Sequence, residues 1–218
     1  MKKEDLKTKA GKVMVTIMAV IILLMPVVTL AGDLEPSSPP GPTMHTLEEI
    51  YNLLYEVKAQ TDANAANVKQ VSCEVKNYRF CDMGNGSVKD MNSGLIWLKD
   101  ANAMGSANWG DAKTAAATLS DGEHGLTDGS SEGDWRLPTK EEWAAFVDTS
   151  YGNPALCNAA GDAKWTKGDA FTDVQPDFYW SSTEYDTASA WYVDLNLGYA
   201  GDSYKLNDYY VWPVRSDN

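Results

Sequence analysis

Histidine and cysteine, on which much enzyme chemistry depends, are scarce in this sequence. Its 218 residues include only two histidines, His45 and His124, and three cysteines. The chain therefore has too few histidines to favour a histidine-based catalytic triad or a histidine zinc site. Carboxylates are plentiful, and their abundance singles out no pair that would suggest a glycosidase. We expect a protein that is not an enzyme and that needs no cofactor or metal.

Basic residues are also few. Eighteen Lys and Arg stand against 31 Asp and Glu, which gives a formal net charge of −13. Several of the lysines lie in the first 31 residues, so loss of that segment would leave the chain still more acidic. An acidic surface repels polyanions. We therefore expect no nucleic-acid partner.

Long apolar runs are missing from the chain after residue 31. The one such run covers 13–31 and follows a lysine-rich leader. Thr29 and Ala31 before Gly32 resemble a signal-peptidase site, so we expect a signal peptide over 1–31. The alternative is an uncleaved N-terminal anchor, because the run is near the length that spans a bilayer. Either reading predicts an exported chain, secreted or at the cell surface, that meets a membrane only through such an anchor.

Two segments follow before the main domain. Residues 32–44 are rich in proline and predict a stiff, extended spacer. Residues 45–72 predict a helical stalk, because apolar residues recur three and four apart as in a coiled coil. The alternative is a single amphipathic helix packed on its own domain. The expected seam consists of Leu47, Ile50, Leu54, Val57, Thr61, Asn64, Val68 and Val71.

The segment 134–143 predicts a junction between a strand and a helix. Thr139 is a helix N-cap residue and Glu142 lies three positions later, which together form a capping box. We expect Arg136 to form a bidentate pair with a carboxylate that fixes the turn. The expected apolar stripe of this helix is Trp143, Ala144, Phe146 and Val147.

The rest of 78–218 predicts one α+β domain of short antiparallel strands and two helices. Apolar runs between 78 and 98 are separated by Asn/Gly turns, as in β-hairpins. Asn108 is the expected cap of a second helix over 109–119. The acids around 82–90 lack the spacing of an EF-hand, so we read that stretch as a hairpin and not as a calcium site.

Three cysteines in an exported chain predict one disulfide and one leftover thiol. Three pairings are open. We expect Cys81–Cys157, because it would tie the long irregular stretch 151–169 to the first strand.

The C-terminal third predicts the ligand surface. Residues 190–197 alternate, with Trp191, Val193, Leu195 and Leu197 expected in the core. Tyrosines mixed with Asp, Asn, Ser and Gly follow, a composition typical of antibody paratopes, although ordinary hairpin turns are the alternative. The candidate ligand-binding residues are Tyr192, Asp194, Asn196, Tyr199, Asp202, Tyr204, Asn207, Asp208 and Tyr209.

A set of ordered motifs resembles a known family. The motifs are Gly94-Leu95-Ile96-Trp97, Trp135-Arg136-Leu137-Pro138-Thr139, Tyr179-Trp180-Ser181-Ser182-Thr183, Ala190-Trp191 and Tyr210-Val211-Trp212-Pro213-Val214-Arg215. Over about 79–216 the chain resembles the C-terminal domain of Legionella collagen-like (Lcl) adhesins, which is related to C-type lectins and formylglycine-generating enzymes. The resemblance implies a C-type-lectin-like head and a homotrimer.

Two activities of those relatives do not carry over. Formylglycine-generating enzymes need a copper-binding cysteine pair near their C-terminus, and no cysteine follows Cys157. Gln175-Pro176-Asp177, with Glu184 downstream, looks like the sugar-binding tripeptide of C-type lectins. The Trp-Asn-Asp motif that accompanies it is missing, so we read the tripeptide as a turn before a buried strand.

These observations predict an exported surface binding or adhesion module that recognises a glycan or a protein through C-terminal loops. Its acidity favours a neutral or cationic ligand over a sulfated one. The alternatives are a structural envelope protein without a dedicated ligand, or a variable target protein of a diversity-generating retroelement.

Overall fold

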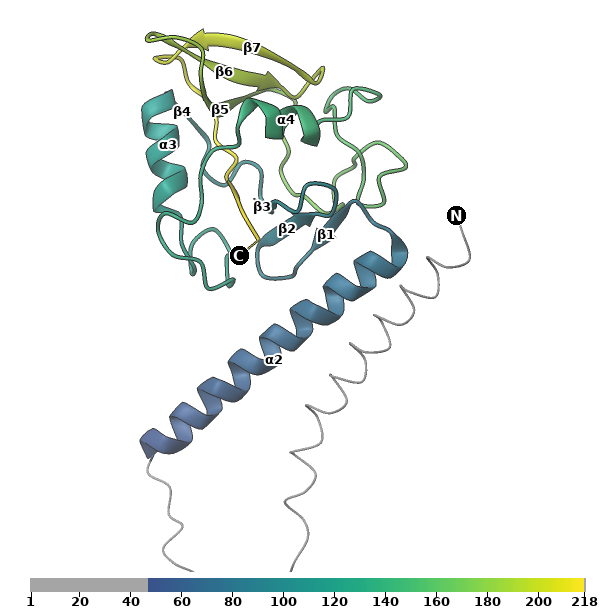
Figure 1. The fold of residues 1–218 in the computed structure, drawn as a ribbon, viewed down its shortest axis with the longest axis vertical. Coiled ribbons are helices and arrows are strands. Elements are labelled where there is room, and N and C mark those ends of the chain that lie inside the picture. The colour runs from purple at the N-terminus through teal and green to yellow at the C-terminus, as the bar shows by residue number, and fades with distance from the viewer. Residues whose placement is uncertain (1–46, 218) are drawn as a thin grey trace, which may run out of the picture. The chain divides into compact units, whose positions relative to one another are not determined.

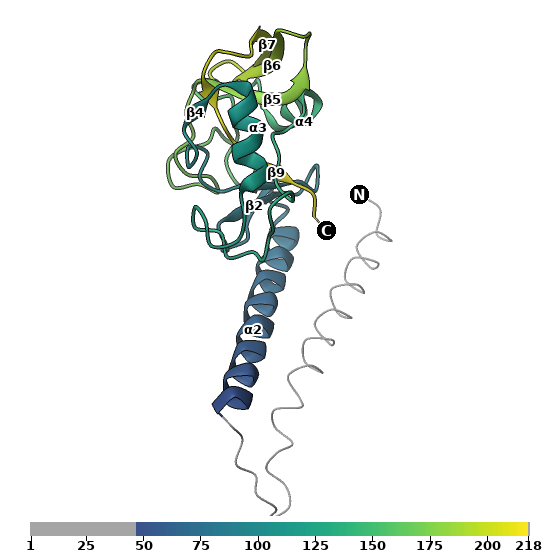
Figure 2. The ribbon, with the colours of Figure 1, turned by 90° about the vertical axis from the view of Figure 1, so that its left-hand side faces the viewer.

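The computed structural model describes residues 47–217 (Figures 1 and 2). The expected signal peptide or anchor and the proline-rich spacer lie outside these residues. Within 47–217 no helix is both long and apolar enough to cross a bilayer. The helices are α2 (Leu47–Lys76), α3 (Trp109–Thr118) and α4 (Lys140–Phe146), and the strands are β1 (Phe80–Asp82), β2 (Ser87–Asp90), β3 (Ile96–Leu98), β4 (Ser106–Ala107), β5 (Phe178–Glu184), β6 (Ser189–Asp194), β7 (Tyr199–Tyr204), β8 (Tyr209–Tyr210) and β9 (Val214–Arg215).

The described residues divide into two units at Thr61, 47–61 and 62–217. The described part of the first unit is helical and belongs to α2, which agrees with the expected helix from residue 47 to 72 and continues to Lys76. The apolar seam residues Ile50, Leu54, Val57 and Val68 are exposed on the single chain. Whether they pair with other copies stays a prediction.

The second unit is an α+β domain with two sheets, as the sequence predicts. One sheet has the order β1-β2-β3-β9, and the other has the order β4-β8-β5-β6-β7. All neighbouring strands are antiparallel except β5 and β8. The hairpins expected between 78 and 98 are β1, β2 and β3. β7 lies at one edge of the larger sheet, at the top of Figure 1.

Aromatic rings fill the core between the sheets and α4. Trp97 stacks on Phe146 with ring centroids 3.9 Å apart. Trp212 meets Phe146 edge-on at 5.3 Å and Phe171 at 5.1 Å. Such tilted and edge-on pairs are the favoured geometry of aromatic side chains, and each contributes beyond its buried area.

The junction before α4 forms as predicted. The Thr139 hydroxyl accepts from the Glu142 amide at 3.1 Å, and the Glu142 carboxylate accepts from the Thr139 amide at 2.7 Å. Arg136 donates to both oxygens of the same carboxylate, at 2.7 and 2.6 Å. Ahead of the helix, Arg136 forms only an isolated bridge to Val214 and no strand. On α4 the apolar stripe is narrower than expected, because Ala144 is exposed.

Candidate functional site

The predicted ligand residues lie mainly on and after the hairpin of β6 and β7. Residues paired across antiparallel strands point to the same face of a sheet. Phe178 pairs with Asp194, which pairs with Tyr199. Tyr192 pairs with Gly201 in the same ladder. These five residues therefore share one face of the larger sheet.

On this face, three aromatic rings contact one another. The centroid of Phe178 lies 4.9 Å from that of Tyr192 and 5.2 Å from that of Tyr209, and Tyr192 and Tyr209 are 5.1 Å apart. All three side chains are half-buried, while Tyr199 is 51% exposed. We call Phe178, Tyr192, Tyr199 and Tyr209 the aromatic face. Beneath it, Trp180 is fully buried and contacts Tyr209 at 4.6 Å.

The absence of a side chain at Gly201 leaves space for the Tyr192 ring. A Cβ atom at Gly201 would lie 2.7 Å from the Tyr192 hydroxyl oxygen and 2.8 Å from Cζ. Only a residue without a side chain lets the ring lie over the backbone of β7 in this way. The ring therefore extends the aromatic face across to the edge strand.

Polar groups border the aromatic face. The Tyr209 hydroxyl donates to the Ser203 hydroxyl at 2.9 Å, and the Asn207 amide donates to the same oxygen at 2.8 Å. A hydrogen bond to the Asp194 carboxylate raises the pKa of Tyr199. Burial raises the pKa of Tyr192. The two phenols therefore remain neutral at physiological pH and keep their O–H groups.

Three expectations about this hairpin are wrong. Asp194 is not presented to solvent: it is 4% exposed, and its carboxylate accepts from the Asn196 amide at 2.8 Å. Leu197 is 56% exposed instead of buried, because β6 ends at Asp194 and Leu197 lies in the turn that follows. Trp191 is half-buried, while Val193 and Leu195 are in the core as predicted.

Two other candidates lie on the opposite face. Asp202 pairs with Trp191 across the ladder, and Tyr204 pairs with Ser189. The Trp191 ring is covered there by the Lys140 ammonium at 3.2 Å and by Tyr185, whose centroid is 5.3 Å away. Asp202 and Tyr204 are therefore separated from the aromatic face by the sheet itself. Asn196 lies in the turn after β6, and Asp208 is exposed just before β8.

Sequence reasoning missed Phe178. The apolar run 178–180 suggested a wholly buried strand, although alternation along a strand sends Phe178 and Trp180 to the face opposite Tyr179. α3 covers that face near Trp180, where Trp109 donates to the Ser181 carbonyl at 2.7 Å. Phe178, two residues away, is left half-buried.

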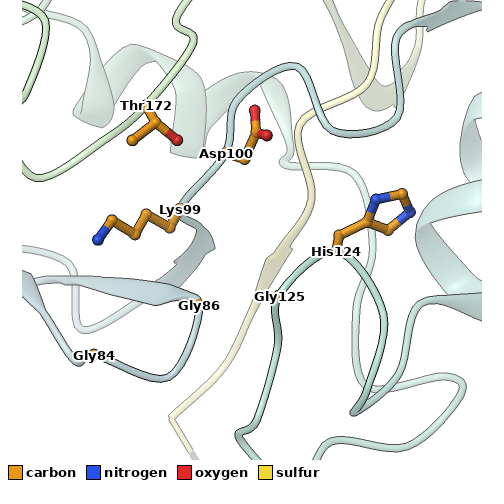
Figure 3. Close-up of a pocket in the computed structure, with 7 residues that line it drawn as sticks. All are labelled: Gly84, Gly86, Lys99, Asp100, His124, Gly125 and Thr172. Atoms are coloured by element: carbon orange, nitrogen blue, oxygen red, sulfur yellow. The ribbon is translucent and has the colours of Figure 1, made fainter.

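Away from the aromatic face, the two best-formed hollows of the domain are open to solvent. The larger has a volume of about 300 Å³. In Figure 3 the Lys99 and His124 side chains point in opposite directions, and Lys99 pairs instead with Asp82 at 2.8 Å. Its lining residues are Gly84, Gly86, Lys99, Asp100, His124, Gly125 and Thr172. The smaller hollow, of about 210 Å³, contains an ion pair between Arg215 and Asp128 at 3.0 Å. The polar side chains of the first hollow do not converge, and polar groups line most of the second, so neither has the usual composition of a small-molecule site.

Among the described residues, no group of three or more His, Cys, Asp or Glu side chains is placed to hold a metal ion. The Gln175-Pro176-Asp177 tripeptide leads into β5 through a bend at Pro176 and Asp177, and β5 is buried from Tyr179 to Ser181 but only half-buried at Phe178. The Asp177 carboxylate accepts from the Phe178 amide at 2.8 Å, and the Gln175 side chain donates to the Asp173 carbonyl.

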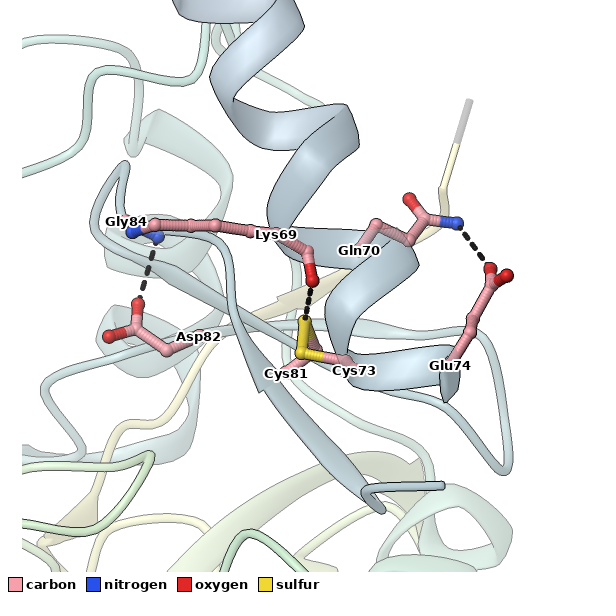
Figure 4. Close-up of a disulfide and its surroundings, with 7 residues drawn as sticks. All are labelled: Lys69, Gln70, Cys73, Glu74, Cys81, Asp82 and Gly84. Atoms are coloured by element: carbon pink, nitrogen blue, oxygen red, sulfur yellow. Dashed lines mark hydrogen bonds between the residues drawn. A yellow bond between two sulfur atoms is a disulfide. The ribbon is translucent and has the colours of Figure 1, made fainter. Parts of the chain in front are cut away.

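The expected Cys81–Cys157 disulfide is wrong. Cys73, in the last turn of α2, is bonded to Cys81 in β1 (Figure 4). The chain reverses at Asn77, whose φ of 56° is left-handed, and this turn brings the two Cα atoms to 5.7 Å. Cys157 is free and buried, and burial raises the pKa of its thiol.

The stretch 151–169 is held without a disulfide. Arg79 donates to the Cys157 sulfur at 3.3 Å and to the Phe146 carbonyl at 2.6 Å. The Phe80 amide donates to the Ala159 carbonyl at 3.0 Å. Hydrogen bonds from β1 and its preceding residue thus anchor this segment.

Comparison with known proteins gives one family. The model of the Lcl C-terminal domain matches residues 86–215, which include every strand from β2 to β9 and all residues of the aromatic face. No curated protein matches the chain.

Proposed function

Because the chain belongs to the Lcl C-terminal domain family, we propose that it is an exported, non-catalytic binding module with a C-type-lectin-like head. Its ligand, a glycan or a protein, contacts the aromatic face of the larger sheet. The stalk expected over 45–72 assembles the chains into a trimer. A secreted or surface-displayed location follows from the signal peptide or anchor expected over 1–31.

One observation supports the aromatic face as the ligand-binding surface. Phe178, Tyr192 and Tyr209 contact one another at about 5 Å yet remain half-buried. Aromatic residues that serve only the core are covered, as Trp97 and Trp212 are. A contiguous aromatic surface bordered by polar groups is typical of binding sites for partners.

The polar border supplies the directional part of recognition. The Ser203 hydroxyl, the Asn207 amide and the phenol of Tyr199 can donate to or accept from ligand hydroxyl and amide groups. Sugar rings stack on flat aromatic faces, so this combination suits a glycan. The acidic composition favours a neutral or cationic ligand.

Matched tyrosine variants test the proposal. Wild type, a variant with Tyr192, Tyr199 and Tyr209 replaced by Ala, and a control with Tyr185 and Tyr204 replaced by Ala are applied to a glycan array with and without calcium. The control tyrosines are 54% and 69% exposed and lie outside the aromatic face. We expect the first variant to bind any hit about tenfold more weakly or worse, a loss of about 1.4 kcal/mol or more, and the control to bind normally.

Folding is checked by circular dichroism and thermal melting. A folded aromatic-face variant with unchanged affinity would place the site elsewhere. Absence of any ligand, on the array and among proteins of the surrounding surface, would favour a structural envelope protein instead.

A further inference from the structure

The edge of the larger sheet at β7 is open. β7 pairs with β6 over all six of its residues without a register shift, and no strand in residues 47–217 lies on its other side. The remaining sheet edges are short: β4 and β9 have two residues each and β1 has three. Proteins usually shorten, bulge or charge such edges to prevent further pairing. β7 contains no proline, lysine or bulge.

The ladder shows which backbone groups of β7 are used. The Lys205 amide donates to the Ala188 carbonyl at 2.9 Å, so these residues form a hydrogen-bonded pair. Hydrogen-bonded and non-hydrogen-bonded pairs alternate in antiparallel ladders. Continuing the register, the amide and carbonyl groups of Ser203 and Gly201 also face β6.

The alternate residues therefore face outward. The amides of Ala200, Asp202 and Tyr204 point away from β6. So do the carbonyls of Ala200 and Asp202, while the Tyr204 carbonyl accepts from Asn207 in the following turn at 3.0 Å. Three donors and two acceptors at the spacing of a strand are thus presented along one exposed edge.

Side chains leave room for a neighbour on both faces. Ala200, Gly201 and Ser203 are small, and the tyrosines at 199 and 204 stand at opposite ends of β7. A strand added about 4.8 Å from β7 would place alternate side chains beside Tyr199 and Ser203. It would therefore extend the aromatic face by one strand.

The charge of β7 indicates which kind of polypeptide segment could pair with it. β7 carries one exposed carboxylate, Asp202, and no cation. The lysine that follows it, Lys205, is engaged by Glu184 at 3.2 Å and by the carbonyls of Asp186 and Thr187. Cations on the side of the added strand that faces the same way as Asp202 would meet this carboxylate and the Tyr204 ring, both of which attract them, while the alternate side chains would lie beside Tyr199 on the aromatic face.

We propose that β7 accepts an extended, basic segment of a partner polypeptide as a sixth strand of the larger sheet. The main chain of the segment pairs with the outward groups of β7, and its side chains reach the aromatic face. This inference rests on the proposed function, since it names a protein as the ligand of that surface, but it uses backbone groups that the aromatic-face variants leave intact.

The test uses the whole protein and a capped octapeptide that alternates lysine with threonine. Amide hydrogen exchange is measured by NMR before and after peptide is added to saturation. In the free protein, the amides of Ala200, Asp202 and Tyr204 should exchange faster than those of Gly201 and Ser203. With peptide, the first three should become protected. No binding at millimolar peptide, or binding without protection of these amides, overturns the proposal.

Two peptides and two variants separate pairing from charge. Peptides that alternate lysine with proline, or glutamate with threonine, should bind about tenfold more weakly or worse. Ala200→Pro removes one outward donor and should weaken binding of the lysine–threonine peptide to a similar extent, while Ala200→Val keeps the donor and should bind normally. Equal binding of the lysine–proline peptide, or full binding by folded A200P, contradicts strand addition. Loss of glycan binding in the aromatic-face variant alongside normal glycan binding by A200P would support the proposed surface independently of this inference.

Discussion

Gly201→Ala should displace the Tyr192 ring while the domain remains folded. The added Cβ would lie 2.7 Å from the Tyr192 hydroxyl oxygen, where ordinary contact begins at 3.4 Å. The ring must therefore retreat by about 0.7 Å, the difference between these distances, and can do so because it is half-buried at the surface. Its contacts with Phe178 at 4.9 Å and Tyr209 at 5.1 Å should loosen.

Gly201→Ala should change the free energy of unfolding only slightly, because two effects oppose each other. Overpacking costs about 1–3 kcal/mol, and the lower end applies to a flexible ring tip. Replacing glycine by alanine outside the left-handed region contributes about 0.4–1 kcal/mol by restricting the unfolded chain. We expect a net loss of about 0–1 kcal/mol, which lowers the melting temperature by at most about 4 °C in a domain of this size.

A double-mutant cycle gives the sharper result. In a Tyr192→Ala background the clash is gone, so Gly201→Ala should stabilise the protein by about 0.4–1 kcal/mol. Urea unfolding of the four proteins measures the coupling, and NMR contacts of the Tyr192 ring report its movement. Equal effects of Gly201→Ala in both backgrounds would refute the account of how this glycine positions the aromatic face.

Other predictions concern the rest of the chain. Thr139→Ala should destabilise the domain by about 1 kcal/mol through loss of the N-cap bond, as urea unfolding will measure, and Thr139→Ser should restore most of it. The Glu142 carboxyl has a lowered pKa, because the hydrogen bonds it accepts from Arg136 and Thr139 outweigh the opposing effect of its burial. The stability that this carboxylate contributes should be present above its unfolded pKa and be lost as the pH falls through its folded pKa. Glu142→Gln should therefore make the free energy of unfolding depend less on pH in this acidic range. Cys157 should resist thiol reagents in the native protein and react after unfolding, while non-reducing peptide mapping finds Cys73 joined to Cys81; rapid native labelling of Cys157 would contradict its burial. The double variant Leu54→Ser/Val57→Ser should lower the oligomeric mass measured by light scattering, whereas Leu53→Ser, which lies off the expected seam, should leave it unchanged. A monomeric wild-type protein would contradict the proposed trimer.

Local signals in the sequence predicted local structure well. The capping box at Thr139 and Glu142 and the hairpins between 78 and 98 depend on residues close together in the chain, so spacing identified them. For Arg136 the sequence predicted a bidentate pair with a carboxylate, and the structure identifies that carboxylate as Glu142. Helix α2 was predicted for the same reason, since the periodic spacing of its apolar residues is a property of one segment, while its assembly into a coiled-coil stalk stays a prediction.

Features that depend on distant segments were harder to predict. Pairing of Cys81 depends on a left-handed turn at Asn77, which places Cys73 beside β1, and spacing gave no measure of that geometry. Asp194 looked like a surface residue from alternation, but the end of β6 turns its carboxylate onto the backbone of the following turn. Phe178 joined the aromatic face because α3 covers only part of that face.

The central claim is that the ligand lies on the aromatic face, and tyrosine ring signals test it most directly. Protein with carbon-13-labelled tyrosine is titrated with the ligand that the array identifies, and ring correlations of the assigned tyrosines are followed. The account predicts shifts at Tyr192, Tyr199 and Tyr209, with Tyr185 and Tyr204 unchanged. Shifts confined to Tyr185 and Tyr204, or saturation of binding without any change at the aromatic face, would contradict it.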